Sequence, residues 1–299
     1  MDALTRTPYY MCSTTDVLVD RTSVVHSGLR KGTEAIRIGR REHHRRKVTM
    51  SADIALQGRT ALVTGATSGI GKAIAQNLAS QGAILVLHGR DQARGEALVK
   101  EIEAEGGSAR FIAADLTDAD DTLRLAAEAG AVDILVNSAG LYAFAPTAAS
   151  DAASFDRQVA INTRAPFLLV GALAPGMAER GHGSIVIVGS SAARMPAPVG
   201  AAYGASKAGV EILTRYWATE FGPSGVRVNT VSPGPVHTEG TKAMLGEHTA
   251  MLDKANARGR AGDPSEIAEI VSFLVGPASS YVNGAVLFAD GGELSALPS

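Results

Sequence analysis

The sequence predicts an α/β fold in which about seven parallel strands form a doubly wound sheet with helices on both faces. Short aliphatic runs alternate with segments whose apolar residues recur at helical spacing, the pattern of repeated strand–helix units. A glycine-rich turn follows the first of these runs and precedes a helical segment. The chain has 299 residues, of which 45% are hydrophobic, and this suffices for one large core in a single domain.

The predicted elements follow one another from residue 60 onwards. Strands are expected at 60–64, 84–88, 111–115, 134–136, 184–189, 226–231 and 286–289. Helices are expected to pass through 73–79, 97–102, 155–167, 203–221 and 267–274, and a further helix opens at 118. The segment 237–260 interrupts this alternation, and its Met and Leu residues at helical spacing make it the candidate lid and substrate wall. The same residues are equally suited to ordinary core positions.

Residues 1–50 differ in composition from the rest of the chain. They hold ten Lys and Arg residues against five Asp and Glu residues, and the run from Arg40 to Lys47 is strongly basic. Such a run can bind nucleic acid or an anionic surface, or belong to a targeting sequence, although no apolar region or cleavage site follows it. Periodic apolar patterning begins only after Met50, which favours a disordered extension or sequence upstream of a true start at Met50. The folded domain is then 51–299.

Composition narrows the classes of function. A formal net charge of −2 gives no overall basic face for nucleic acid. No apolar run approaches the ~20 residues that cross a bilayer, so no membrane span is expected. Cys12 is the only cysteine, which excludes an internal disulfide and favours a reducing, cytoplasmic compartment. No cluster of His, Cys, Asp and Glu has the spacing of a zinc site, so no catalytic metal is expected.

A phosphate-binding turn is predicted between residues 65 and 71. The first strand runs into Gly65, Gly69 and Gly71, and the helix that follows offers its N-terminal amides and the positive end of its dipole. Glycines let the backbone approach a pyrophosphate closely, as in dinucleotide-binding folds. The spacing is Gly-x-x-x-Gly-x-Gly, so the Gly-x-Gly-x-x-Gly fingerprint is not matched. A glycine-rich turn alone can be only a tight turn, but the strand before it and the helix after it favour a nucleotide.

The end of the second strand bears on the choice of cofactor. In such folds an acid near this point contacts the ribose 2′-hydroxyl of NAD, whereas an Arg accommodates the 2′-phosphate of NADP. The chain has Arg90 here, and Asp91 is suited to cap the next helix. We therefore predict NADP. NAD is the alternative, in which Arg90 is a surface residue stacked loosely on adenine.

A Tyr and Lys pair is the strongest catalytic candidate. Tyr203 and Lys207 are four residues apart in a predicted helix, so both side chains leave from the same face. A phenol titrates near ~10, and a nearby ammonium is expected to lower its pKa until the phenol is a usable general acid and base. The pair alone is a weak signal, because a solvated Lys beside a half-buried Tyr arises by chance in many helices.

Several motifs occur in one order, each at a strand end or a helix start. They are Thr64-Gly-x-x-x-Gly-Ile-Gly71, Asn137-Ser-Ala-Gly140, Ser190, Tyr203-x-x-x-Lys207 and Pro233-Gly234. In this combination the chain resembles the short-chain dehydrogenase/reductase family, in its single-domain branch with a Rossmann-type sheet, from about Ala52 to Leu294. It departs from the family at Ser138, where a second Asn is usual. It also lacks a basic residue at Thr67 or Ser68, where many NADP-preferring members place one.

The resemblance implies a catalytic group of Asn162, Ser190, Tyr203 and Lys207. Tyr203 would exchange a proton with the substrate oxygen, and Ser190 would hydrogen-bond that oxygen where negative charge develops, with Ser191 as its rival. Lys207 would lower the Tyr203 pKa and hold the nicotinamide ribose, and Asn162 would hold a water that links Lys207 to solvent. The implied cofactor contacts are Gly65, Thr67, Ser68, Gly69, Ile70, Gly71, Arg90, Asp115, Leu116, Asn137, Ala139, Gly140, Tyr203, Lys207, Pro233, Gly234, Val236 and Thr238.

The expected activity is hydride transfer between a nicotinamide and a small-molecule carbonyl or secondary alcohol. A 3-oxoacyl-thioester reductase is the alternative. A non-catalytic nucleotide-sensing regulator is less favoured, since it needs no proton donor. His237 is expected at the pocket rim rather than as a base. The family implies a homotetramer, with which the apolar residues on more than one face of 155–175 and 203–221 agree. The predicted substrate contacts are Ser190, Leu141, Tyr142, Met195, Tyr203 and Met244, with Ala192, Val199 and Leu245 as further candidates.

Overall fold

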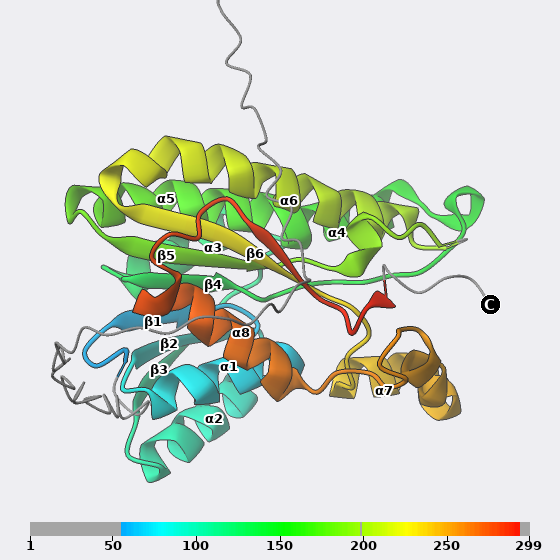
Figure 1. Cartoon of the computed structure of the whole chain (residues 1–299), viewed down its shortest axis with the longest axis horizontal. Helices are drawn as coiled ribbons and strands as arrows, with labels where there is room; N and C mark the ends of the chain where they lie inside the picture. The colour runs from blue at the N-terminus through cyan, green and yellow to red at the C-terminus, as the bar shows by residue number, and fades with distance from the viewer. Residues whose placement is uncertain (1–54, 198, 294–299) are drawn as a thin grey trace, which may run out of the picture. The chain divides into compact units, whose positions relative to one another are not determined.

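The computed structural model describes residues 55–197 and 199–293, and within them the predicted α/β fold is confirmed (Figure 1). The basic segment 1–50 lies outside these residues. Seven parallel strands form one sheet in the order β3-β2-β1-β4-β5-β6-β7. The strands are β1 (Thr60–Val63), β2 (Ile84–Gly89), β3 (Ser108–Ala113), β4 (Ile134–Asn137), β5 (Gly183–Val188), β6 (Val226–Pro233) and β7 (Val286–Ala289).

Helices cover both faces of this sheet, as the alternation of strands and helices predicts. Figure 1 shows α1, α2 and α8 on one face and α3, α5 and α6 on the other, with a separate buried cluster under each set. The helices are α1 (Gly69–Ser80), α2 (Gln92–Ala104), α3 (Ala119–Ala129), α4 (Ala152–Val159), α5 (Ala165–Glu179), α6 (Ala201–Phe221), α7 (Glu239–Leu245) and α8 (Pro264–Val275).

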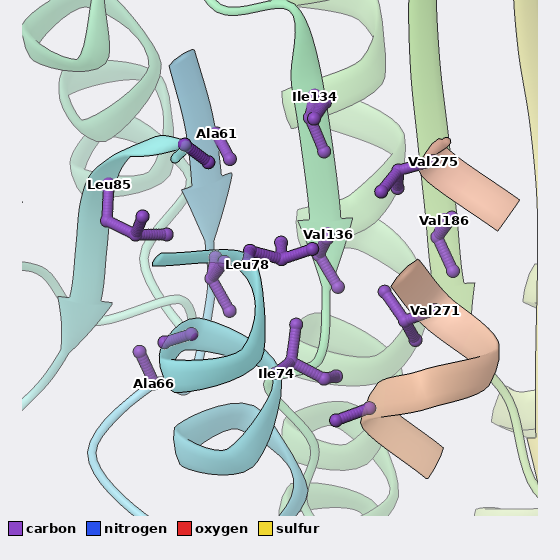
Figure 2. Packing of buried hydrophobic residues seen from close by; sticks show 14 of the residues in the cluster. Ala61, Ala66, Ile74, Leu78, Leu85, Ile134, Val136, Val186, Val271 and Val275 are labelled. Carbon is purple, nitrogen blue, oxygen red and sulfur yellow. The ribbon is translucent and has the colours of Figure 1, made fainter. Parts of the chain in front are cut away.

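The strands contribute to both clusters, which explains why they are continuous apolar runs. Ala61 and Val63 belong to the cluster under α1 and α8, whereas Leu62 between them belongs to the opposite one. Figure 2 shows Ala61 and Val136 facing Ile74 and Leu78 of α1. Successive side chains of a strand point to opposite faces, so a sheet covered on both faces needs apolar residues at every position.

The strand order determines where a ligand can bind. From β1 the chain adds β2 and β3 on one side, and then returns to add β4 to β7 on the other. The loops that leave β1 and β4 therefore diverge and open a crevice at the carboxyl edge of the sheet. The glycine turn after β1 and the segment Ser138–Gly140 after β4 both lie at this crevice.

The helix predicted through 155–167 is not a single regular α-helix. α4 ends at Val159, a π-helical segment runs from Ala160 to Arg164, and α5 follows without a break. Apolar residues at helical spacing predict a helix, but this spacing does not show whether one turn within the helix is a wider π-helical turn. The wide turn brings Asn162 into a buried position, where 2% of it is exposed.

The same helical run corrects the expectation that no segment is long and apolar enough for a membrane span. Ala152–Glu179 is continuous over 28 residues and passes that test by length and composition. In this fold, however, residues of α5 such as Leu169, Leu173 and Met177 are buried in the core beside the sheet. Burial on one face of a sheet therefore accounts for its apolar character.

Other element boundaries differ slightly from those expected. β3 runs from Ser108 to Ala113, so Asp115 follows the strand instead of ending it, and its Oδ1 accepts from the Thr117 amide at 2.9 Å. α6 begins at Ala201, before Tyr203. The segment predicted as a lid contains α7 and a 3-10 helix at Gly246–Lys254.

Candidate active site

One cavity of about 780 Å³ lies at the carboxyl edge of the sheet and brings together most of the predicted site residues. Five residues from the predictions are not part of its lining, namely Asn137, Asn162, Val199, His237 and Leu245. The predicted residues that line it are Gly65, Thr67, Ser68, Gly69, Ile70, Gly71, Arg90, Asp115, Leu116, Ala139, Gly140, Leu141, Tyr142, Ser190, Ala192, Met195, Tyr203, Lys207, Pro233, Gly234, Val236, Thr238 and Met244.

The glycine turn forms one end of the cavity. Gly65 and Gly69 have φ angles of +65° and +51°, in the left-handed region that favours glycine. A Cβ at Gly71 would collide with the carbonyl of Gly65, so this turn closes only without a side chain there. The Thr64 hydroxyl accepts from the Ser138 and Ala139 amides at 3.0 and 3.1 Å, which joins this turn to the segment after β4.

A buried histidine that the sequence analysis missed supports this turn. His88, at the end of β2, is 2% exposed, and its Nδ1 accepts from the Gly65 amide at 3.2 Å. Its Nε2 lies 3.1 Å from the carbonyl of Ala114, so the neutral ring carries its proton on Nε2. Burial lowers the pKa of His88 to about 4. The sequence signal that could have identified His88 is a polar residue near the end of an otherwise aliphatic strand.

Two arginines lie near the end of β2. Arg90 is exposed and lines the cavity. Asp91 accepts from the Arg94 amide at 3.1 Å and caps α2, which confirms its predicted helix-capping role. The Arg94 guanidinium donates to the carbonyl of Thr67 at 3.0 Å and to Glu239, the first residue of α7, at 2.9 Å.

Ser190, Tyr203 and Lys207 meet in the middle of the cavity. Ser190 follows β5 and lies beside the Tyr203 phenol, whose pKa it acts to lower. Its Oγ also accepts from the Ala192 amide at 3.2 Å, in a 3-10 turn that begins after it. Lys207 is 4% exposed, and its Nζ donates to the carbonyl of Val188 at 2.8 Å. The phenol and the ammonium therefore leave the same face of α6 and enter one site.

The pKa values in this cluster differ from the expectation for the Tyr and Lys pair. Burial raises the pKa of the Tyr203 phenol, and neighbouring Ser190 opposes that shift. Lys207 does not reverse it, because Nζ points to Val188 and lies 5.9 Å from the centroid of the Tyr203 ring. Burial lowers the pKa of Lys207 to about 8, and Glu211 one turn further along α6 opposes that shift. The four-residue spacing predicts that Tyr203 and Lys207 share one face of α6, but it does not predict the burial that shifts their pKa values.

Asn162 acts on the walls of the cavity rather than inside it. Its Oδ1 accepts from the Leu141 amide and its Nδ2 donates to the Leu141 carbonyl, both at 2.8 Å. Nδ2 also donates to the Ser206 hydroxyl at 2.9 Å. The π-helical segment therefore holds together the loop after β4 and the first turns of α6, which carries Tyr203.

The opposite end of the cavity is largely apolar and aromatic. Tyr142 and Phe144 lie edge-on to the Tyr203 ring, with centroids 6.3 and 5.7 Å away. Met195 and Met244 line the same cavity. Phe144 was not predicted, because it lies in a loop without periodic pattern.

A comparison with known proteins identifies the family. A family model described as enoyl-(acyl carrier protein) reductase matches residues 65–293. A solved structure described as a short chain dehydrogenase/reductase family protein is 47% identical, with a TM-score of 0.77, and the match covers 81% of this chain and all of that one. The chain belongs to the short-chain dehydrogenase/reductase family.

Other members of this family show which activities occur close to this sequence. D-threitol dehydrogenase of Mycolicibacterium smegmatis is 40% identical over 251 residues, which cover 82% of this chain and 96% of the relative. The crystal structure of a putative NAD(P)-dependent gluconate 5-dehydrogenase from Beutenbergia cavernae, with bound NADP, is 38% identical with a TM-score of 0.77. That match covers 81% of this chain and 98% of the other.

Within this short-chain dehydrogenase/reductase, two predicted residues have different surroundings from those expected. β4 continues through Asn137, so its side chain is buried with the strand, and neither of its polar atoms has a partner among the described residues. His237 was expected at the pocket rim, but it does not line the cavity, and its Nε2 lies 2.9 Å from Asp253 Oδ1. It therefore fixes the 3-10 segment that follows α7.

Proposed function

We propose that this protein is an NADP-dependent oxidoreductase that interconverts a carbonyl group and a secondary alcohol on a small molecule. The observation that carries the proposal is that the Ser190 and Tyr203 hydroxyl groups and buried Lys207 line the same cavity as the glycine turn. A carbonyl oxygen placed between the two hydroxyls receives hydrogen bonds from both. Hydrogen bonds aimed at developing negative charge are among the largest contributions to catalysis.

The residues at the other end fit a dinucleotide. The turn Gly65–Gly71 packs so tightly that a Cβ at Gly71 has no room, and the backbone can approach a pyrophosphate there. The N-cap residue of α1, Ser68, makes no capping bond with its side chain, so the first-turn amides are available to an anion. Arg90 is the candidate ligand for a 2′-phosphate. When bound, the nicotinamide supplies or accepts the hydride.

Each polar residue then has a distinct task. Tyr203 gives its proton to the substrate oxygen in reduction and takes it back in oxidation. Lys207, with a pKa of about 8, changes charge near neutral pH and can restore the proton of Tyr203. Asn162 keeps Leu141 and Ser206 in place, as a positioning residue for the loop and the helix that carry the site. Thr238 and Val236 lie beside the cavity from the segment after β6.

A Tyr203→Phe variant tests the proposal. We expect turnover of secondary alcohols and ketones to fall by about 10²- to 10⁴-fold, the usual contribution of general acid–base catalysis. The variant keeps the ring and its packing, so NADPH binding measured by fluorescence titration remains, and remains tighter than NADH binding. Retained turnover in the variant would refute the mechanism, and a preference for NADH would refute the role of Arg90.

A 3-oxoacyl-thioester reductase is the second candidate function. It is favoured by the description of the matching family model, which names the acyl carrier protein. Turnover of an acetoacetyl thioester compared with that of small ketones and sugars separates the two candidates. A nucleotide sensor without catalysis has no need of the complete Ser190, Tyr203 and Lys207 group.

We also propose a cytoplasmic homotetramer. Exposed apolar side chains on α5 and α6 support it, because Phe167, Ile212 and Tyr216 are 52%, 49% and 69% exposed. Large apolar side chains gathered on an outer helical layer are typical of subunit interfaces. The single cysteine of the chain supports the compartment, since a reducing environment needs no disulfides.

A further inference from the structure

A carboxylate enters the substrate end of the cavity from the end of the described chain. β7 is followed by a tight turn in which Gly291 and Gly292 have φ angles of +63° and +84°. Asp290 Oδ1 accepts from the Gly292 amide at 2.9 Å, and the Asp290 carbonyl accepts from the Glu293 amide at 3.1 Å. This turn directs Glu293 into the cavity, whose lining it joins.

Glu293 lies beside the segments that follow β5 and β6 rather than at the glycine turn. Its carboxylate lies beside Ser191, the residue after Ser190, and Ser191 acts to lower the pKa of this carboxylate. Its Oε2 is close to Gly234, where an added Cβ would lie only 2.9 Å from that oxygen. Glycine at 234 therefore leaves room for the carboxylate. The nucleotide-end carboxylate in the described lining, Asp115, follows β3.

The Glu293 carboxylate has acceptor capacity that the protein leaves unused. An ionised carboxylate offers about four lone-pair sites. Neither carboxylate oxygen accepts a hydrogen bond that the described structure shows, and Oε2 is buried against the protein. Burial raises the pKa of Glu293, as expected for a partly desolvated acid with too few donors. A ligand hydroxyl group that donates to this carboxylate supplies what the protein does not.

The other residues that line the cavity bear on which ligands Glu293 can bind. The side chains of Tyr142, Phe144 and Met195, which also line the cavity, carry no charge. They therefore do not compete with the Glu293 carboxylate for substrate hydroxyl groups. Of the cations in the described lining, Lys207 is committed to Val188, Arg90 is at the end of β2, and Arg157 is an exposed residue of α4. None of these forms an ion pair with Glu293 in the described structure. Its negative charge therefore acts directly on whatever occupies this end.

We infer that Glu293 is a specificity-determining residue that selects neutral polyols and their ketoses over the corresponding sugar acids. Hydroxyl groups adjacent to the reacting carbon donate to its carboxylate, whereas a substrate carboxylate meets a like charge in a partly desolvated site. This inference rests on the proposed function. The relatives include a protein named for each kind of substrate, a threitol dehydrogenase and a putative gluconate dehydrogenase. The choice between a neutral polyol and a sugar acid therefore differs among members of the family.

The experiment compares matched substrates with wild-type protein and Glu293→Gln. The glutamine keeps the size of the side chain but removes its charge. The substrates are a pentitol and the aldonate of the same configuration, with a simple secondary alcohol in addition. We expect kcat/KM for the pentitol to fall and kcat/KM for the aldonate to rise, so that their ratio changes by about tenfold or more. A residue with a merely structural role would lower both values together.

Glu269→Gln is the matched control, because it removes one exposed negative charge from α8, outside the cavity lining. It should leave the ratio unchanged, and thermal melting of both variants checks that they fold. A wild-type preference for the aldonate, or an unchanged ratio in Glu293→Gln, would overturn the inference alone. Failure of wild-type protein to oxidise or reduce any alcohol or ketone would instead refute the proposed function, and this inference with it.

Discussion

A single buried imidazole at the end of β2 connects the two loops that form the nucleotide end of the cavity. His88 accepts from Gly65 in the glycine turn and donates to Ala114 after β3. The bond from the Gly65 amide requires an unprotonated Nδ1, so the ring is neutral and carries its proton on Nε2. A protonated ring would present a donor to the Gly65 amide, which is itself a donor, so the charged form disrupts the turn.

This arrangement predicts a dependence of stability on pH. The pKa of His88 is about 4 in the folded protein and near its ordinary 6.5 when unfolded. The unfolded chain therefore binds the proton first as pH falls. Stability is full above about pH 6.5 and declines between about 6.5 and 4, by roughly 3 kcal/mol for this residue.

Urea unfolding over this pH range measures the effect. His88→Asn keeps an acceptor near the Gly65 amide and does not titrate. It should be less stable than wild type near pH 8, and it should lack the His88 part of the acid decline. His182→Asn, at an exposed histidine, is the control and should keep the wild-type decline. An equal decline in His88→Asn would show that the folded imidazole is not held neutral.

At the scale of elements, the π-helical segment between α4 and α5 couples the site to the scaffold. A wide turn displaces Asn162 from a regular helical position and places its amide against the backbone of Leu141. The same amide reaches Ser206 on α6. Three segments distant in sequence are thus joined by one side chain, and all three contribute residues to the cavity.

Asn162→Ala should separate positioning from stability. Removal of the amide leaves the partly buried N–H and C=O of Leu141 without their partner, which costs about 1–3 kcal/mol of unfolding free energy. We expect kcat to fall more than NADPH affinity, because Tyr203 and the loop after β4 shift while the glycine turn stays.

The chain offers a matched control for this variant. Asn283 also accepts from a backbone amide and donates to a carbonyl, those of Val228 and Ala218, away from the cavity lining. Asn283→Ala should lose stability with kcat unchanged. Chemical denaturation and steady-state kinetics measure both effects, and equal losses of kcat in the two variants would contradict a specific role for Asn162.

At the scale of the whole molecule, the features that were predictable are local and repetitive. The aliphatic runs around Leu62 and Val136 predict a sheet covered on both faces, and the glycine turn predicts a ligand at its carboxyl edge. The role of Asp91 as a helix cap also followed from its position. Each of these depends only on neighbouring residues.

The features that were not predictable depend on contacts between distant segments. The low pKa of Lys207 and the raised pKa of Tyr203 come from burial, which sequence spacing does not report. His88 meets Ala114 and Glu293 meets Ser191 only after the strands are assembled. Asn137 was predicted at the ligand and is instead buried with β4, because the strand extends one residue further than expected.

The proposed assembly is tested at this scale. Ile212 and Tyr216 are exposed one turn apart on α6, so replacing both with Asp introduces charge into one apolar face. We expect wild-type protein to sediment as a tetramer and this double variant to sediment as smaller species. Leu123→Asp, on the exposed side of α3, should remain tetrameric. A wild-type monomer in sedimentation velocity would refute the assembly.

The guanidinium of Arg94 has a consequence for the sequence of events at the site. It donates to the carbonyl of Thr67, in the glycine turn, and to the carboxylate of Glu239, at the start of α7. A dinucleotide that settles against the first contact thereby steadies the second. We therefore expect compulsory-order kinetics, in which the coenzyme binds before the molecule that it reduces or oxidises. Because both side chains of the ion pair are half or more exposed, dissolved salt weakens this linkage.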